Sequence, residues 1–413
     1  DSSSGNASCL GPMSGLKGQR QQFEDTLATL TNDKTTRLVL VARADRHSIT
    51  EAARTSTELS ELGVSNQWFA VNGLLDGEES DDEVARAMCN RQADALDMMP
   101  DAVRALPRTD VGLCAVSPIG VDGLRSILQS GHAVSLESLT ASEQAMASDA
   151  LGLSELLDEL DASAGIIMTM GKGGVGKTTL ASKIAVEMAA RGAKVHLTTS
   201  DPAAHLDFSL SDRHANLRVS RIDPVVETER YRQEVMQQAG SQLDEEGRRL
   251  LEEDLRSPCT EEIAVFRAFA KVVDEAKDSV VVVDTAPTGH TILLLDATEA
   301  YHREVSRNRS SVPDEVKLLL PRLRDPKFTR IMIVTLPEAT PVQEAFDLQQ
   351  DLERAGIAPH AWIVNQSLAP LTVRHPVLSA KRASELEHIN RVKTLAARLA
   401  LAPWQADALP KTS

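Results

Sequence analysis

The sequence is poor in aromatic residues and cysteines, and it has fewer basic than acidic side chains. Aromatic residues make up 3% of its 413 residues. Its four cysteines are widely spaced and include no C-x-x-C pair; they are Cys9, Cys89, Cys114 and Cys259. Such spacing is typical of reduced cytosolic thiols and argues against a disulfide framework. With 60 acidic and 44 basic residues the net charge is −16, which argues against binding along a nucleic-acid backbone.

Long hydrophobic runs are also missing. No apolar run approaches the ~20 residues that a membrane-spanning helix needs. The first residues, Asp1–Gly5, are polar and begin without methionine, so they do not resemble a signal peptide. The sequence therefore predicts a protein without a membrane span of its own, and the missing methionine indicates that an upstream portion is absent. Apolar residues, at 42%, suffice for a sizeable core.

A glycine-rich motif is the strongest functional signal in the chain. Residues 171–179 match the pattern G-x-x-x-x-G-K-[ST], follow the apolar run Ile166–Met168 and open a helical pattern over Thr178–Arg191. Strand, glycine loop and helix in this order predict a phosphate-binding loop, in which backbone N–H groups and a helix N-terminus face a polyphosphate. The spacing assigns Lys177 to the β/γ-phosphates and Thr178 to Mg²⁺. The residues predicted to hold the nucleotide here are Gly171, Gly173, Gly174, Val175, Gly176, Lys177, Thr178 and Thr179.

Two segments of the chain repeat at a constant offset of 293 residues, as in 365 − 72 = 293. More than thirty residues align in this way without a gap, and they include an apolar strand pattern, a helix pattern, a glycine and a second strand that ends in asparagine. We interpret the match as an internal duplication of an α/β unit. The paired positions are Arg37–Val41 with Arg330–Val334, Glu51 with Glu344, Gly63 with Gly356, and Asn72 with Asn365.

The duplication is unequal. The glycine loop lies 194 residues before Asn365 (365 − 171), whereas only 71 residues precede Asn72 and none of them forms a second such loop. We therefore expect residues 1–137 to be the C-terminal part of a first unit whose P-loop is missing, and residues 164–413 to be a complete second unit. Residues 138–163, rich in Ser, Ala, Glu and Asp, are expected to be a linker with a short helix. The expected fold is α/β: a P-loop NTPase with a mostly parallel sheet flanked by helices, in tandem pseudo-duplicated units of which the first is incomplete.

Two aspartates follow apolar strand patterns of the second unit. Asp284 comes directly after Ser279–Val283, the place of the Mg²⁺-side carboxylate in P-loop NTPases. Asp201 comes shortly after Lys194–Thr198, where it could orient water or contact Mg²⁺. The alternative for Asp201 is an N-cap before a helix that begins at Pro202, and both roles are compatible.

Asn365 ends a third apolar strand pattern, Ala361–Val364. At the carboxyl edge of a parallel sheet this position suits an amide that reads the edge of a nucleotide base. An ordinary turn asparagine explains the residue equally well.

The glycine loop has the deviant Walker A form, with Lys172 directly after the first glycine. Together with Asp201-Pro202 and the segment Asp284–His290, it resembles the ArsA and tail-anchored-targeting family of ATPases. The duplication, the thiols and the segment Arg256–Glu262 are similar to the arsenite-transporting ArsA branch, and the resemblance covers nearly the whole chain. It implies ATP sites at an interface between two pseudo-dimeric halves, ATP and Mg²⁺ as cofactors, and Thr178 and Asp284 as Mg²⁺ ligands. The catalytic residues that it implies are Lys172 (acting across the interface), Lys177, Asp201 and Asp284.

The resemblance also implies a metalloid site that joins the two halves. The matched positions are Cys9, Ser257, Cys259 and His290, and a thiophilic As(III) or Sb(III) suits thiolates with an imidazole. Without the family, the alternatives are an ordinary buried thiol for Cys259, and for His290 a capping histidine or one that supports a neighbouring ligand. Cys89 and Cys114 match no ligand position and are expected to be structural.

These features together predict a cytoplasmic ATPase subunit of an arsenite/antimonite efflux pump, with As(III) or Sb(III) as activator. The expected partners are an integral-membrane arsenite carrier, which would hold the subunit at the inner membrane, and an arsenic metallochaperone; nucleic acid is not expected. The alternative is an ATP-dependent targeting factor for tail-anchored membrane proteins. That function needs a methionine-rich apolar groove and commonly a zinc-binding C-x-x-C, whereas the ten methionines here are scattered.

Overall fold

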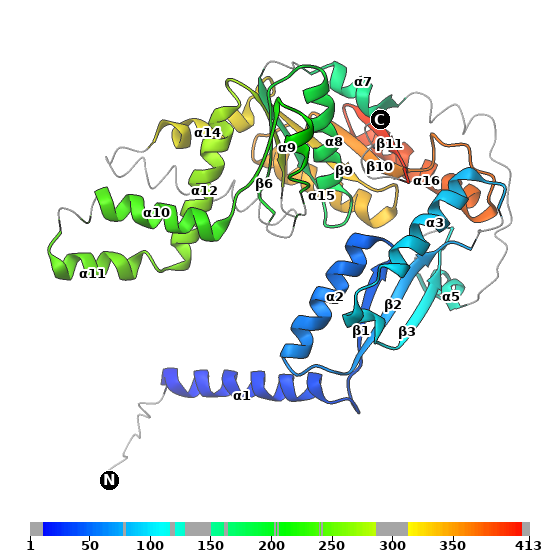
Figure 1. Ribbon diagram of the computed structural model, residues 1–413, viewed down its shortest axis with the longest axis horizontal. Helices are drawn as coiled ribbons and strands as arrows, with labels where there is room; N and C mark the ends of the chain where they lie inside the picture. The colour runs from blue at the N-terminus through cyan, green and yellow to red at the C-terminus, as the bar shows by residue number, and fades with distance from the viewer. Residues whose placement is uncertain are drawn as a thin grey trace, which may run out of the picture. The chain divides into compact units, whose positions relative to one another are not determined.

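The computed structural model describes residues 11–76, 80–115, 120–128, 150–160, 164–201, 204, 206–238, 240, 243–285 and 313–406. The chain divides into two compact units, whose elements are labelled in Figure 1. Unit 1 comprises Asp1–Leu136 and Thr372–Lys381, and unit 2 comprises Glu137–Leu371 and Arg382–Ser413.

Unit 1 contains a parallel sheet with the strand order β1-β2-β3. The strands are β1 (Leu38–Arg43), β2 (Gln67–Leu74) and β3 (Arg108–Gly112). The helices are α1 (Gly11–Thr31), α2 (Arg46–Glu61), α3 (Glu83–Asp97), α4 (Asp101–Arg104) and α5 (Gly120–Leu128). Leu40, Phe69 and Val71 on one face of the sheet are buried with Ile49 of α2, so the crossover helix covers this face.

Unit 2 contains a second parallel sheet, with the strand order β4-β11-β10-β9-β5-β8-β6-β7. Its strands are β4 (Leu151–Gly152), β5 (Gly165–Met170), β6 (Val195–Thr199), β7 (Leu217–Arg221), β8 (Val280–Asp284), β9 (Thr329–Thr335), β10 (Ala361–Ser367) and β11 (Leu399–Pro403). Its helices are α7 (Leu153–Asp158), α8 (Lys177–Ala190), α9 (Leu210–Arg213), α10 (Pro224–Gln238), α11 (Glu245–Asp254), α12 (Pro258–Glu275), α14 (Asp314–Arg324), α15 (Ala339–Arg354) and α16 (Pro376–Leu395). The first residues of α16 belong to unit 1.

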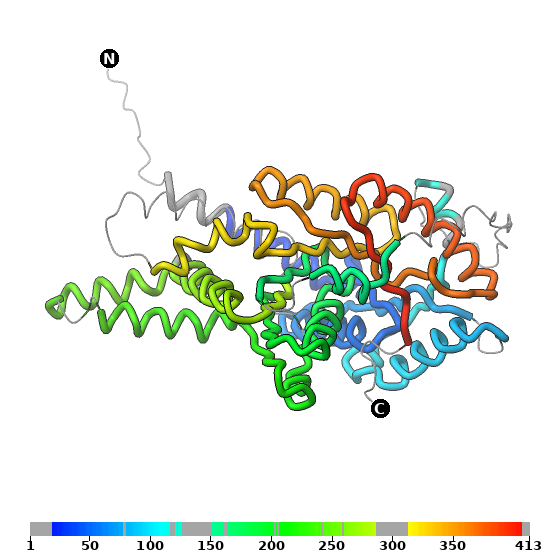
Figure 2. The backbone as a smooth tube through the Cα atoms, turned by 90° about the horizontal axis from the view of Figure 1, so that it is seen from above, coloured from blue at the N-terminus to red at the C-terminus, as the bar shows by residue number. Residues whose placement is uncertain are grey.

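Helices cover both faces of the unit 2 sheet. One core cluster joins the strands to α7 and α8, and the other joins them to α12, α14, α15 and α16. Burial on both faces explains why β8 is a continuous run of valines rather than an alternating strand. The expected α/β fold, with a parallel sheet flanked by helices, is confirmed. Helices α10, α11 and α12 form a group that extends from the sheet in both views (Figures 1 and 2).

The grouping of residues differs from the boundaries expected from sequence in two places. Part of the expected linker belongs to unit 2: β4 pairs with β11, and Leu156 and Leu157 of α7 are buried in its core. Those leucines anchor the segment because burying a leucine side chain contributes about 1.5–3 kcal/mol. In the opposite direction, Thr372–Lys381 groups with unit 1 rather than with the rest of α16.

Candidate nucleotide site

The glycine loop leaves the centre of the unit 2 sheet. β5 lies between β8 and β9, and residues 171–176 connect its end to α8. Gly171 has φ 153°, and a Cβ there would collide with the carbonyl oxygen of Val334 at the end of β9. Gly176 has φ 90°, and a Cβ there would collide with the side-chain amide of Asn365 on β10. The loop is thus packed closely against two neighbouring strands, which only glycine permits at these positions.

The loop ends at the N-terminus of α8. Gly176 is the N-cap of this helix, and the first helical N–H groups lack partners within the helix, so they are available to an anion. Leu180, Ile184 and Met188 are buried and hold the helix on the sheet. Of the other predicted residues, Gly173 and Gly174 are exposed, Val175 is buried and Thr179 is half-buried.

Lys177, the first residue of α8, is 6% exposed. Its Nζ donates to the carbonyl oxygen of Lys172 at 2.9 Å, so the side chain curls over the loop. Burial lowers the pKa of Lys177, while the charges of Asp284 and Asp201 act in the opposite direction. Its acceptor is a neutral carbonyl. A phosphate oxygen would therefore be a stronger acceptor for this ammonium group.

Asp284 lies beneath the loop at the end of β8 and is fully buried. Its Oδ2 accepts from Thr178 Oγ1 at 2.7 Å and from Thr199 Oγ1 at 3.2 Å. Its Oδ1 is shielded from solvent and has no hydrogen-bond donor among the described residues. Burial raises the pKa of Asp284, and the Thr178 hydroxyl and the Lys177 charge lower it. A carboxylate with a free oxygen beside a threonine hydroxyl fits Mg²⁺, which prefers oxygen ligands.

Asp201 and Asn365 both lie near the loop. Asp201 is half-buried, its N–H donates to Thr199 Oγ1 at 3.1 Å, and its charge acts on Lys177. The helix expected from Pro202 falls partly outside the described residues, and Ala204 is not helical. Asn365 is buried, and its Nδ2 donates to the Val175 carbonyl at 2.9 Å, which supports the loop. Its contact with a base stays a prediction, as does the role of Asp201 in catalysis.

Lys172 has a partner that the sequence reasoning missed. Its Nζ lies 2.5 Å from Glu344 Oε1 on α15, within the same unit. No local signal in the sequence indicates this pair, because the two residues are 172 positions apart. The action of Lys172 across an interface stays a prediction.

The residues predicted to bind metalloid are mostly beyond the described part of the chain. Cys9 and His290 lie outside it, and only the backbone of Cys259, in the first turn of α12, is described. Ser257 is the N-cap of this helix, with its Oγ 3.3 Å from Thr260 Oγ1. Within the described ranges, no three His, Cys, Asp or Glu residues are arranged to hold a metal ion. The metalloid site therefore stays a prediction.

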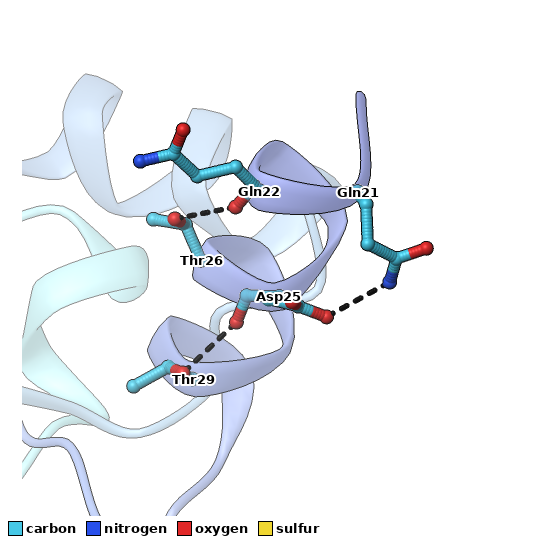
Figure 3. A pocket seen from close by; sticks show the side chains of 5 residues that line it. All are labelled: Gln21, Gln22, Asp25, Thr26 and Thr29. Carbon is cyan, nitrogen blue, oxygen red and sulfur yellow. Dashed lines mark hydrogen bonds between the residues drawn. The ribbon is translucent and has the colours of Figure 1, made fainter. Parts of the chain in front are cut away.

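A pocket on α1 has a different character (Figure 3). Thr26 Oγ1 donates to the Gln22 carbonyl at 2.7 Å, and Thr29 Oγ1 donates to the Asp25 carbonyl at 2.9 Å. Gln21 Nε2 donates to Asp25 Oδ1 at 3.0 Å. Because these polar groups bond within their own helix, we assign the pocket no ligand.

Comparison with known proteins agrees with this geometry. The family model "Anion-transporting ATPase" matches residues 2–130, 164–311 and 301–403. An arsenical pump-driving ATPase of Escherichia coli is 49% identical over 406 residues, which cover 98% of this chain and 69% of the relative. That of Acidiphilium multivorum is 48% identical over 98% of this chain and 69% of its own length. ATPase GET3A of Arabidopsis thaliana is 27% identical over 48% of this chain and 65% of its own length.

Proposed function

The chain belongs to the anion-transporting ATPase family, and on that premise we propose that it hydrolyses Mg-ATP to drive an arsenical efflux pump. Membership of this family makes it an ATP-hydrolysing enzyme. The observation that carries the proposal is the phosphate loop above the Thr178–Asp284 pair, in a chain that is 49% identical to an arsenical pump-driving ATPase over 98% of its length. The targeting alternative has weaker support, because GET3A matches only about half of the chain, at 27% identity.

The proposed chemistry is attack of water on the γ-phosphate. The loop N–H groups and the α8 N-terminus bind the phosphates, and Lys177 exchanges the Lys172 carbonyl for a phosphate oxygen. Mg²⁺ held by Thr178 and Asp284 would neutralise charge on the β- and γ-oxygens. Thr199 would orient the Asp284 carboxylate through Oδ2, and Asp201, two residues after the end of β6, would orient the attacking water.

The proposed partner is an integral-membrane arsenite carrier, and an arsenic metallochaperone would deliver the metalloid. The names of the E. coli and A. multivorum relatives support a pump partner. Among the helices that the structure describes, none has the length and apolarity to cross a membrane. We propose a cytoplasmic location at the inner membrane through that carrier.

Substitution of Lys177 tests the nucleotide site. Lys177→Ala removes a charge-assisted phosphate contact worth roughly 1.5–3 kcal/mol, so a fluorescent ATP analogue should bind about 10- to 150-fold more weakly. Lys183→Ala is the matched control, because Lys183 lies on the same helix but its Nζ contacts Gln405 at 2.6 Å. Equal binding by wild type and Lys177→Ala would show that the phosphate loop is wrongly assigned.

Substitution of the thiols tests the metalloid site. The proposed ligands are Cys9, Ser257, Cys259 and His290, and thiolate is the ligating form of cysteine. Any stimulation of ATP hydrolysis by antimonite should depend on these thiolates, so Cys9→Ser or Cys259→Ser should remove it. Cys114→Ser is the control, since this half-exposed thiol matches no ligand position. Stimulation that survives both ligand substitutions would overturn the site.

A further inference from the structure

The ion pair between Lys172 and Glu344 joins residues 172 positions apart in the sequence. Gly171 packs against Val334 at the end of β9, and α15 begins at Ala339, only a few residues later. The start of the phosphate loop is therefore held beside the first turns of α15. Lys172 and Glu344 meet at 2.5 Å with side chains that are 46% and 36% exposed.

Glu344 has no alternative cation among the described residues. Its Oε1 contacts Lys172, and its Oε2 is shielded from solvent without a described hydrogen-bond partner. The equivalent residue in unit 1, Glu51, pairs with Arg54 one turn later on its own helix at 3.0 Å. In unit 2 the position equivalent to Arg54 is Asp347 (54 + 293 = 347), which cannot neutralise Glu344. The carboxylate is thus left for Lys172.

We propose that Glu344 is a positioning residue that holds the Lys172 ammonium on α15 until nucleotide binds, and that Lys172 leaves Glu344 as phosphate enters the loop. The inference rests on the proposed function, because it takes Lys172 to be the loop lysine that serves a polyphosphate.

Two contacts at Lys172 give the reason for its release. Lys177 Nζ donates to the Lys172 carbonyl at 2.9 Å, and a phosphate that recruits Lys177 frees this carbonyl and the backbone that carries it. An exposed ion pair shifts an equilibrium by a factor of about five or less, so a polyphosphate with several charges can compete for the ammonium group. Glu344 therefore retains Lys172 weakly enough for nucleotide to release it.

Lysine reactivity measures this contact without relying on hydrolysis. Full-length protein is treated briefly with an acetylating reagent, and modification of Lys172 is measured by mass spectrometry relative to Lys317, an exposed lysine of α14. Without nucleotide, Glu344→Gln should raise Lys172 modification about two- to fivefold. Asp347→Arg should do the same by giving Glu344 the cation that Glu51 has in unit 1. Asp347→Asn, which removes a charge from the same helix face, is the control and should leave Lys172 unchanged.

A non-hydrolysable ATP analogue with Mg²⁺ then tests the release. The difference between wild type and Glu344→Gln should disappear at saturation, because Lys172 of the wild type has then left Glu344 and is as free of this contact as in the variant. In hydrolysis assays, any change in kcat/KM that Glu344→Gln causes should be absent when Lys172 is also replaced by Ala. If Glu344 had only a structural role, the change in kcat/KM would persist in the Lys172→Ala background. No difference without nucleotide overturns the holding contact, and a difference that persists with nucleotide overturns the release. Failure to bind the analogue would instead contradict the proposed function, and the nucleotide-free comparison would still decide the contact.

Discussion

The repeat places the same residues in two different environments. Val41 on β1 is 64% exposed, whereas Val334, 293 positions later on β9, is fully buried. On their other faces the two strands are alike, because Leu40 packs with α2 as Ile333 packs with α15. The difference comes from β5 and α8. β5 pairs with one edge of β9, and α8 belongs to the core cluster that buries Val334. Among the described residues, β1 has no such strand or helix on the corresponding edge and face.

Asparagine and leucine show the same contrast. Asn72 at the end of β2 is exposed, whereas Asn365 at the end of β10 bonds to the phosphate loop. Leu30 of α1 is 40% exposed, and its equivalent Leu323 of α14 (30 + 293 = 323) is 4% exposed. An apolar pattern therefore predicts which face of an element can be buried, but the neighbouring elements decide whether it is.

The largest expected effect is on hydrogen exchange. β9 is paired on both sides and should open only with the sheet, whereas the described part of the chain pairs β1 with β2 alone. Amides of Thr329–Thr335 should therefore exchange on the order of a thousandfold more slowly than those of Leu38–Arg43. Native-state exchange with mass spectrometry measures both strands in one sample. Equal protection would show that the edge of β1 is covered by residues outside the described ranges or by a second chain.

Matched leucine truncations test the contrast energetically. Leu323→Ala should lower the free energy of unfolding of unit 2 by about 2–5 kcal/mol, because it leaves a cavity between α14 and the sheet. Leu30→Ala should change that of unit 1 by less than about 0.5 kcal/mol, since the side chain is already in contact with water. Urea unfolding followed by hydrogen exchange measures the free energy of unfolding of each unit separately. A large effect at Leu30 would mean that α1 is packed in solution.

Two buried aspartates extend the comparison to charge. Asp82 of unit 1 accepts from the N–H groups of Val84 and Ala85 through Oδ1 and from those of Arg374 and His375 through Oδ2. Burial raises the pKa of Asp82, but the four donors outweigh it and hold the pKa below its usual range. Asp284 of unit 2 has two hydroxyl donors and a raised pKa. The Asp82 carboxylate has donors on both oxygens, whereas Oδ1 of Asp284 has none among the described residues.

Substitution of these aspartates should have opposite effects. Asp82→Ala should destabilise unit 1 by roughly 2–4 kcal/mol, since it removes a helix N-cap and the oxygen that accepts from two further N–H groups. The Asp82 contribution should be present above its unfolded pKa of about 3.9 and be lost as pH falls through the lower folded pKa. At Asp284 the folded pKa is the higher one, so stability is lost as pH rises through it. Asp284→Asn should therefore stabilise the nucleotide-free protein at pH 7 by roughly 1–2 kcal/mol while hydrolysis is lost. Thermal unfolding from pH 3 to 8 distinguishes the two signs.

Much of the site followed from the sequence because its determinants are local. The loop at Gly171, the helix after it (expected from Thr178 and observed from Lys177) and the strand that leads to Asp284 each depend on a few consecutive residues. The contacts that sequence reasoning missed are long-range: Thr199 with Asp284, Lys172 with Glu344, and β4 with β11. Two residues of β4 carry no strand signal of their own, and the strand forms because β11 offers an open edge.

The smallest expected effect concerns the residue after the repeated asparagine. Gly73 has φ 83°, and its equivalent Gln366 (73 + 293 = 366) has φ 55°, so both units use the left-handed region here. A side chain in this region costs about 1 kcal/mol, and a Cβ at Gly73 would lie 3.8 Å from Leu113 Cδ1, which is an ordinary van der Waals contact without a clash. Gly73→Gln should therefore destabilise unit 1 by about 1 kcal/mol through backbone strain alone.

Gln366→Gly should change the stability of unit 2 by less, because relief of strain is offset by the greater freedom of glycine in the unfolded chain. Gln366 lies beside Gly176, so the strain at Gln366 has two candidate roles: it serves the nucleotide loop, or it is inherited from the repeat. Nucleotide affinity of Gln366→Gly decides between these roles: a loss of affinity at unchanged stability supports a role in the site, and unchanged affinity shows that the left-handed conformation is inherited from the repeat.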